Sequence, residues 1–598
     1  ANPFRRLRLV LVVFGVLFAA LAVRLGQLQV IGADQLEALG EAQRIRTIAL
    51  PAGRGAILDR NGDDLAVSLA QQTVWADPRF VDDPAATAEA LAPLLGVDRA
   101  DLADRLATEG AFVYLARQVT DDVAARVDDL GLPGINLLAE PTRFNPAGDL
   151  ARSVLGRVDV DGVGSAGVER QYDDVLSGAP GQLIVERDPD GRTIPQGERE
   201  VDPAVAGDDL LLTIDRALQY EAERVLADQI VAMGAQGGTV VVSNPRTGEI
   251  YALANLQVLE PSGPPVATGN NVALTTVFEP GSVNKVITMS AAREEDVVCP
   301  TSTLQVPDHL QVSDHLFSDA HDHGVESWTP TDIIATSSNV GTIMLARELG
   351  PERIDEYLRR FGFGTRTGLG FPDESPGLLL DPDDWSGTSM GSIPIGHSVA
   401  VTPMQLLAAY NVIANDGVYT EPQLVRGTVD SQGHTVETRP PATRRVISEE
   451  TARQVRDMMV AVVEAGTGRQ ATIDGYAVAG KTGTARKPQP GGGYENAAGQ
   501  YEYVTTFAGF VPAEEPQLSI VVVIDEPSAG IYASQVAAPV FAELAAYALR
   551  QFSIPPAAGP YEFTVPRPTD AEEPIVVEPE PTVVRSAPAV APPDAGGG

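Results

Sequence analysis

Apolar residues dominate the start of the chain. An unbroken apolar run covers residues 9–23 (LVLVVFGVLFAALAV), and further apolar residues up to Ile31 extend it to about the length that crosses a bilayer. Three arginines precede the run and acidic sequence follows it. This charge order predicts residues 1–8 in the cytoplasm, a transmembrane anchor at 9–31 and the bulk of the chain outside the cell. A signal peptide cleaved at the Ala-Leu-Ala of residues 20–22 is the alternative.

The following segment carries mixed patterns. The stretch 50–68 (LPAGRGAILDRNGDDLAVS) alternates apolar residues with turn signals and predicts short strands. Residues 84–131 are rich in Ala, Leu and Asp with helical spacing, and residues 151–200 are rich in glycine and turns. We therefore predict an extended α/β module over residues 45–205, called the pedestal below.

The pattern changes near residue 206. A strand, a helix N-cap at Asp215 and a long amphipathic helix come first. Strand signals return at GYAVAGKTGTA, YVTTFAGFVP and LSIVVVIDEP, with helical stretches between them. These patterns predict an α/β (α+β) unit over 206–553, called the head domain below, with an antiparallel sheet covered by helices. Residues 554–598 are rich in Pro, Ala and Glu and predict a disordered tail.

Composition narrows the classes of protein. The net charge of −38 makes nucleic acid an unfavourable partner, so we predict none. The single cysteine, Cys299, allows no internal disulfide and leaves the redox compartment open. The 43 basic residues include lysine at only three positions: 285, 481 and 487. A genome rich in arginine codons explains the arginines, but it does not explain where these lysines lie.

The first lysine follows a serine at helical spacing. The stretch 277–292 (VFEPGSVNKVITMSAA) predicts a helix that begins after Pro280 and Gly281. Ser282 would lie in the first turn, and Lys285 would place its amine on the same face. A serine hydroxyl needs a base to become a nucleophile, and a lysine amine can serve once burial lowers its pKa, whereas arginine cannot. A helix cap followed by a solvated lysine is the alternative.

The second lysine ends an apolar strand, VAGKTGTA. Gly483 would let the backbone of a ligand approach this strand closely. Thr482 and Thr484 share one side of the strand, while Lys481 shares the other side with Gly483. A strand edge with hydroxyls and one cation suits an extended peptide that ends in a carboxylate. A strand that simply ends in a polar turn is the alternative.

A third polar stretch, ATSSNVGTIMLARELG, places Ser337 and Asn339 where a loop enters an amphipathic helix. By itself it is also compatible with a capping stretch. Ser-x-x-Lys, Ser-x-Asn and Lys-Thr-Gly nevertheless occur in this order, and together they use two of the three lysines. The combination favours chemistry over three separate structural explanations.

These motifs are the signature of penicilloyl-serine transferases. The stretches RGAILDRNGDDLAVS, GSAGVERQYDDVLSGAPG, VVVSNPRTGEIYALAN and IPIGHSVAVTPMQLLAAYNVIANDG extend the resemblance from the anchor to about residue 550. Over this length the chain resembles the class B penicillin-binding proteins, which are membrane-anchored peptidoglycan D,D-transpeptidases. The resemblance implies a penicillin-binding transpeptidase fold, with a five-stranded antiparallel sheet flanked by helices, on a non-catalytic pedestal of the dimerisation type.

The resemblance also implies a mechanism. Ser282 would attack the D-Ala–D-Ala peptide of a stem peptide with Lys285 as the general base, and β-lactam antibiotics would acylate the same serine. Ser337 would relay the proton, tuned by Lys481, while the backbone N–H groups of Ser282 and Thr484 form the oxyanion hole. The implied substrate-binding residues are Asn339, Thr482, Gly483 and Thr484. No cofactor is implied.

Two features modify this picture. Many relatives have Thr-Phe between the serine and the lysine, where this chain has Val-Asn, which changes the floor of the site. The short pedestal and the stretches GVERQYDDVLSGAPG and FSDAHDHG look more like the cell-division (septal, FtsI-type) branch than the elongation branch, which is the alternative. The septal interpretation implies an FtsW-type glycosyltransferase and other divisome proteins as partners in the membrane.

Other functions were weighed for the same residues. Histidines at 309, 315, 321 and 323 alternate with aspartates near Cys299, so a zinc site is conceivable, but no ligand pair has zinc-finger spacing and we predict no metal. We expect His397 to pack rather than catalyse. The loop 488–503 either gates the groove or only connects a hairpin.

Two rival classes share the motifs. A D,D-carboxypeptidase or β-lactamase would transfer the acyl group to water instead of an amine, and the anchor and pedestal argue against a β-lactamase. A non-catalytic scaffold or β-lactam receptor is disfavoured because all three motifs are intact.

Overall fold

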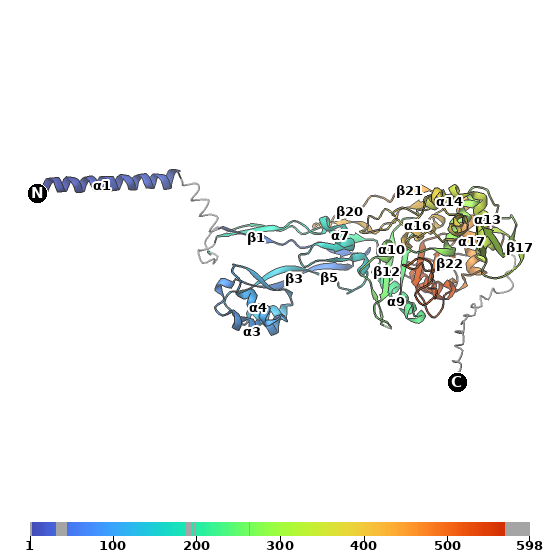
Figure 1. The fold of residues 1–598 in the computed structure, drawn as a ribbon, viewed down its shortest axis with the longest axis horizontal. Coiled ribbons are helices and arrows are strands. Elements are labelled where there is room, and N and C mark those ends of the chain that lie inside the picture. Colours follow the sequence, from blue (N-terminus) through green and yellow to red (C-terminus); the bar gives the residue numbers. More distant parts are fainter. Residues whose placement is uncertain (1–2, 32–44, 187–193, 195–198, 262, 569–598) are drawn as a thin grey trace, which may run out of the picture.

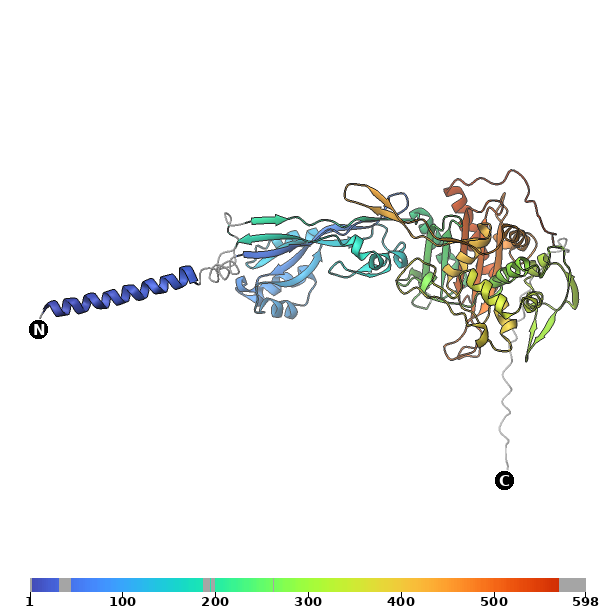
Figure 2. The same ribbon diagram turned by 90° about the horizontal axis from the view of Figure 1, so that it is seen from above.

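The chain forms an elongated molecule whose parts follow one another in a line (Figures 1 and 2). In this computed structural model residues 3–31, 45–186, 194, 199–261 and 263–568 are described. A long helix lies at one end, the pedestal follows, and the broad head domain occupies the other end.

The N-terminal helix α1 (Pro3–Gly26) continues into a π-helical turn (Gln27–Ile31). Its segment Pro3–Gln29, 27 residues long, is apolar enough to cross a membrane, and none of it is buried against the protein. At 1.5 Å per residue this segment reaches about 40 Å, more than the ~30 Å of a hydrocarbon core. The helix therefore supports the predicted anchor, although it begins before residue 9.

The pedestal is built on a long antiparallel strand pair, β3 with β5, flanked by β4. Three helices, each begun by an Asp or Thr N-cap, cover this pair and bury residues such as Leu91, Leu102 and Leu115. The strands are β1 (Ile45–Leu50), β2 (Ile57–Leu58), β3 (Asp64–Ala76), β4 (Val113–Val119), β5 (Ile135–Phe144), β6 (Arg157–Val158), β7 (Gly164–Ala166), β8 (Gly181–Glu186) and β9 (Arg199–Asp202). The helices are η2 (Pro78–Phe80), α3 (Pro84–Leu95), α4 (Arg99–Leu106), α5 (Asp121–Asp128), α6 (Arg152–Leu155), α7 (Gly167–Gln171) and α8 (Asp173–Leu176).

One sheet joins the pedestal to the head domain. Its order is β20-β19-β10-β2-β3-β4, with β5 on β3, so the pedestal strand β2 pairs in parallel with the head strand β10. Beside this joint the guanidinium of Arg54 contacts Glu169 and Asp173, each at 2.6 Å, and Arg143 contacts Glu169 at 2.6 Å. Arg54, Arg143 and Glu169 are almost fully buried and Asp173 is partly exposed, and each has an opposite charge within hydrogen-bonding distance.

The head domain contains a six-stranded antiparallel sheet in the order β13-β12-β11-β24-β23-β22. Five strands are long, and the sixth, β13, adds only three residues at the edge beside β12. Residues alternate between the two faces: Val240 and Val242 pack in the core with α9 and α19, whereas Val241 packs in the core with α11, α16 and α17. The predicted layered arrangement is confirmed.

The strands of the head domain follow one another along the chain in this order. They are β10 (Asp209–Leu212), β11 (Gly237–Ser243), β12 (Ile250–Val258), β13 (Pro265–Ala267), β14 (Leu304–Pro307), β15 (His309–Val312), β16 (His315–Ser318), β17 (Val325–Trp328), β18 (Val418–Thr420), β19 (Val425–Val429), β20 (Thr435–Glu437), β21 (Thr443–Arg445), β22 (Ala479–Arg486), β23 (Tyr503–Val511) and β24 (Leu518–Asp525).

Helices cover both faces of the sheet. In chain order, the helices of the head domain are α9 (Arg216–Met233), α10 (Val272–Thr275), η3 (Gly281–Asn284), α11 (Lys285–Glu294), α12 (Pro330–Ala335), α13 (Asn339–Leu349), α14 (Pro351–Arg360), η4 (Pro382–Asp384), α15 (Ser389–Ser392), η5 (Ile393–Ile395), α16 (Pro403–Ala414), α17 (Glu449–Glu464), η6 (Arg469–Ala471), α18 (Ala533–Val536) and α19 (Ala538–Gln551). As predicted, the side chain of Asp215 caps α9 by accepting from Leu218 N–H.

The start of the predicted tail differs from the expectation. Residues 554–568, called the C-terminal strap below, lie on α17, where Tyr561 Oη donates to Asp457 Oδ1 at 2.6 Å. Asp457 Oδ2 accepts from the backbone N–H and the hydroxyl of Thr564. Val565 is 6% exposed within the main core. The first part of the predicted tail therefore packs on the head domain. Residues 569–598 lie outside the described residues.

We predict that the C-terminal strap stabilises the head domain. A chain that ends at residue 556 leaves the buried Asp457 carboxylate without these donors, which costs about 3 kcal/mol of unfolding free energy. A chain that ends at residue 568 keeps the contacts and serves as the control. Denaturant unfolding of the two truncated proteins and of the full chain measures the effect. Equal midpoints for the three would contradict the prediction.

Candidate active site

Ser282 lies in the 3₁₀ turn η3, which leads directly into α11. The turn is fixed from inside: Tyr410 Oη donates to Val283 O at 2.9 Å, and Asn284 Nδ2 donates to Ile393 O at 2.8 Å. Val283 and Asn284 are fully buried, while Ser282 is partly exposed. The Val-Asn pair thus forms the floor, and Ser282 is the residue of the turn that faces outward.

Ser337 is the point where the two lysines meet. Lys481 Nζ donates to Ser337 Oγ at 2.9 Å and to Thr482 O at 3.0 Å. Lys285 Nζ donates to Ser337 O and lies 3.3 Å from Ser337 Oγ. The structure therefore brings together three of the four predicted catalytic side chains. The fourth, Ser282, lies one turn before Lys285, and its hydroxyl has no hydrogen-bond partner among the described residues.

Both lysines are completely buried. Burial lowers the pKa of Lys285 to about 7, and the negative charge of Asp319 acts in the opposite direction. Burial also lowers the pKa of Lys481 well below its usual value, and the charge of Lys285 lowers it further. At neutral pH a neutral amine is therefore present beside Ser337, as a general base requires.

The Lys-Thr-Gly strand β22 is the last strand of the sheet and pairs with β23 on its inner side. A Cβ added at Gly483 would lie 2.9 Å from Pro280 O and 3.0 Å from Val283 Cγ1. Gly483 thus lets the strand approach the turn that carries Ser282. The predicted approach of a ligand's backbone at Gly483 stays a prediction.

The remaining predicted binding residues contact the protein itself. Thr482 Oγ1 lies 2.7 Å from Thr467 Oγ1, and Thr484 Oγ1 accepts from Ala533 N–H at 3.2 Å. Asn339 Nδ2 donates to Ser318 O at 2.8 Å. Their roles toward a substrate stay predictions.

A carboxylate three residues before Ser282 was missed by the sequence analysis. Glu279 accepts from His397 Nδ1 at 2.9 Å, from Ser398 N–H at 2.9 Å and from Tyr494 Oη at 2.9 Å. Burial alone would raise the pKa of Glu279, but these hydrogen bonds lower it below its usual value. Tyr494 belongs to the loop 488–503, so this loop is fastened beside Ser282. No local pattern links residue 279 to residue 494.

The third lysine anchors the start of the same loop. Lys487 Nζ contacts Asp525 at 2.7 Å and Glu526 at 2.6 Å. Burial works against its charge, but the two carboxylates hold its pKa above the usual value. Lys487 is therefore a cation held by ion pairs, unlike the two lysines beside Ser337.

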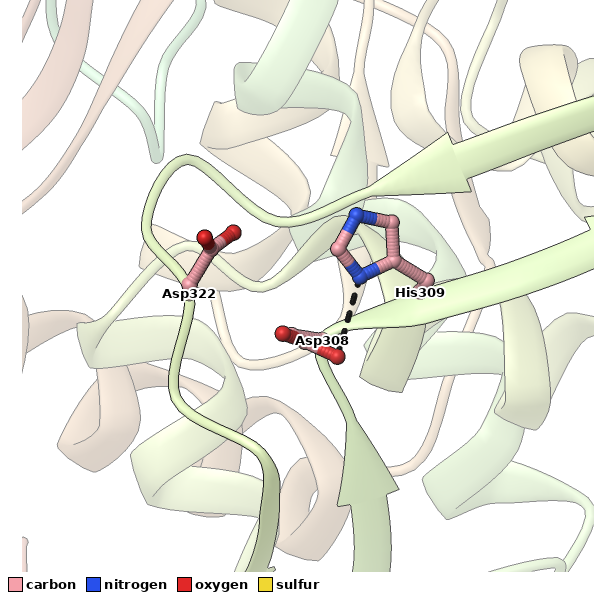
Figure 3. Close-up of side chains that lie close together, drawn as sticks. All are labelled: Asp308, His309 and Asp322. Carbon is pink, nitrogen blue, oxygen red and sulfur yellow. Dashed lines mark ion pairs between the residues drawn. The ribbon is translucent and has the colours of Figure 1, made fainter.

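The histidine-rich segment forms one group with possible metal ligands among the described residues. Asp308, His309 and Asp322 have ligand atoms within 4.8 Å of one another, and His309 Nδ1 lies 2.9 Å from Asp308 Oδ1 (Figure 3). His309 and Asp322 are exposed, and Cys299 is not part of the group. The set of three ligand types that made zinc conceivable is therefore not assembled.

Comparisons with known proteins agree with this geometry. Residues 238–546 match the penicillin-binding protein transpeptidase domain, and residues 49–212 match the penicillin-binding protein dimerisation domain. Penicillin-binding protein PbpB of Mycolicibacterium smegmatis is 36% identical over 90% of this chain and 89% of the relative. Peptidoglycan D,D-transpeptidase FtsI of Escherichia coli is 35% identical over 91% of this chain and 92% of the relative.

Solved structures show the same similarity. A peptidoglycan synthetase from Bifidobacterium adolescentis has a TM-score of 0.71 and 30% identity, and the match covers 88% of this chain and all of that one. Penicillin-binding protein 3 of Mycobacterium tuberculosis in complex with aztreonam has a TM-score of 0.67 and 32% identity, over 87% of this chain and all of that one.

Proposed function

The chain belongs to the class B penicillin-binding proteins and is a serine-type peptidoglycan D,D-transpeptidase, and we propose that Ser282 is its nucleophile. The observation that carries this assignment is the convergence of Lys285 and Lys481 on Ser337 beside the turn that presents Ser282. Both amines are buried, and burial lowers the pKa of Lys285 to about 7.

The proposed acylation begins at the peptide bond between the two D-alanines of a stem peptide. Ser282 Oγ attacks the carbonyl carbon and transfers its proton to Lys285. The backbone N–H groups of Ser282 and Thr484 stabilise the oxyanion. As the tetrahedral intermediate collapses, Ser337 passes its proton to the leaving amine of D-Ala and receives the proton that Lys285 had taken, with Lys481 holding the hydroxyl. An acyl-enzyme ester and free D-Ala result.

The second half of the reaction makes the cross-link. The amine of a neighbouring stem peptide attacks the ester, and its proton returns through the same lysine and serine to Ser282. The free edge of β22 suits the donor peptide, which would add as a strand beside Thr482, Gly483 and Thr484, with Asn339 on its amide. A β-lactam acylates the same serine.

We also propose a septal role with the N-terminus in the cytoplasm. Support comes from the similarity to FtsI over 91% of the chain and from the arginines before α1. An FtsW-type glycosyltransferase and other divisome proteins are the corresponding partners at the membrane.

The nucleophile is tested by covalent labelling with a fluorescent penicillin. We expect Ser282→Ala to abolish labelling, because no other hydroxyl lies on this turn. The exposed pedestal serine Ser165, changed to Ala, is the matched control and should label like the wild type. Labelling that persists in Ser282→Ala would overturn the assignment.

The base is tested by the pH dependence of acylation. Because the reactive form needs a neutral Lys285, the second-order rate of penicillin acylation should rise with pH through a midpoint near 7. Lys285→Arg stays charged and should lower the rate by about 10²- to 10⁴-fold. Lys487→Arg can keep its ion pairs and should leave the midpoint unchanged. A pH-independent rate in the wild type would contradict the role of Lys285.

The septal role is tested by localisation. We expect a fluorescent fusion of the full chain to gather at midcell in dividing cells and depletion of the protein to block septation. Labelling of the lateral wall together with loss of cell shape would instead assign the chain to elongation.

A further inference from the structure

The loop that carries Ser337 is held by a carboxylate outside the three motifs. Asp319 follows β16 and is 6% exposed at its side chain. Its Oδ2 accepts from Ser338 Oγ at 2.7 Å, and its Oδ1 accepts from Val340 N–H at 3.0 Å. Asn339 Nδ2 also donates to Ser318 O, so Ser338 and the first two residues of α13 are all bound to the end of β16 and to Asp319 directly after it.

The backbone conformation of this loop is strained at Ser337. Ser337 has φ +62°, a left-handed conformation that costs a residue with a side chain about 1–3 kcal/mol. Such a conformation persists only when its surroundings hold it in place. Ser338 helps twice, because its oxygen also accepts from Gly341 N–H at 2.8 Å and caps α13. Asp319 thus fixes the residue next to the hydroxyl that meets both lysines.

Asp319 also carries a charge that acts on Lys285. Its negative charge raises the pKa of Lys285 against the effect of burial. The other side chains that face this centre are Lys481, on β22, and His323, whose Nε2 lies 3.1 Å from Asp319 Oδ2. His309 also lies within the field of Asp319. Among these groups only Asp319 is an anion.

His323 in turn holds Asp319 in place. Its ring lies 4.5 Å from that of Trp328, and its Nδ1 is buried without a hydrogen-bond partner in the described part of the chain. The Nε2 atom is then the one that holds the proton toward Asp319. The chain of contacts runs from His323 through Asp319 and Ser338 to the loop of Ser337.

We propose that Asp319 is a positioning residue for acyl transfer, whose carboxylate holds Ser338 and Val340 so that Ser337 stays against Lys285 and Lys481, and whose negative charge acts on Lys285. This inference rests on the proposed transpeptidase function. It assigns Asp319 no contact with the substrate, because its oxygens are occupied by Ser338, Val340 and His323.

The test separates the charge from the hydrogen bonds. Acylation by a fluorescent penicillin is followed from about pH 5 to pH 9 in four variants. In the plot of acylation rate against pH, the acid limb is the rising part that follows deprotonation of Lys285, and the plateau is the rate above it. Asp319→Asn removes the charge, so Lys285 becomes neutral at lower pH and the acid limb moves to lower pH. The plateau rate of this variant should fall about 10- to 100-fold because the loop is misplaced. Asp319→Glu keeps the charge and should keep the limb while the plateau falls.

Two further variants complete the set. Ser338→Ala breaks the tie but keeps the charge, so the plateau should fall with the limb unmoved. Asp322→Asn removes one negative charge from the same segment without touching the loop, and should leave plateau and limb as in the wild type. Thermal melting checks that each variant is folded.

Several results would overturn the inference. An unmoved limb in Asp319→Asn would remove the electrostatic role, and an unchanged plateau in both Asp319→Asn and Ser338→Ala would remove the positioning role. Failure of Asp319→Asn to fold, with normal acylation by Ser338→Ala, would assign Asp319 to folding alone. Failure of the proposed function itself looks different, because wild-type labelling would then not depend on Ser282.

Discussion

The head domain depends on two lysine side chains that share one hydroxyl in a dry interior. An ammonium is costly to bury even with the charge of Asp319 acting on Lys285, and two ammonium groups within reach of Ser337 Oγ repel each other as well. The free-energy cost is lowest when one amine gives up its proton. The same burial that makes this arrangement costly therefore produces the neutral base that a serine hydroxyl requires.

Holding that arrangement requires three elements that are far apart in the sequence. Helix α11 brings Lys285, the loop before α13 brings Ser337, and the edge strand β22 brings Lys481. Each is fixed from behind by the core. Tyr410 holds the turn before α11, the missing side chain of Gly483 lets β22 lie against that turn, and α17 packs behind both the strand and α12. A displacement of any one element would let water reach the lysines.

Local patterns were sufficient to predict the motif residues and the layers of the head domain, because amphipathic periodicity and capping act within a few residues. Asp319, Glu279 and the C-terminal strap could not be predicted in this way. Their partners lie in other elements: Glu279 meets Tyr494, and Asp457 meets Tyr561. The strap also has a composition typical of disorder, and its partner Asp457 lies 104 residues before Tyr561 in the chain. The close approach of Gly483 to the turn of Ser282 joins two distant elements, so no local pattern could predict it.

The joint between pedestal and head domain gives the site its orientation. Where two domains are connected by a flexible linker, relative motion is the default. Here strand β2 of the pedestal pairs with β10 of the head domain, so backbone hydrogen bonds continue from one part into the other. Glu169 lies between Arg54 and Arg143 at this joint, and removing it would leave the buried Arg143 without its ion pair and Arg54 with Asp173 alone. The head domain that carries Ser282, the proposed nucleophile, is therefore joined to the pedestal by a shared sheet, which sets the orientation of the site relative to the pedestal.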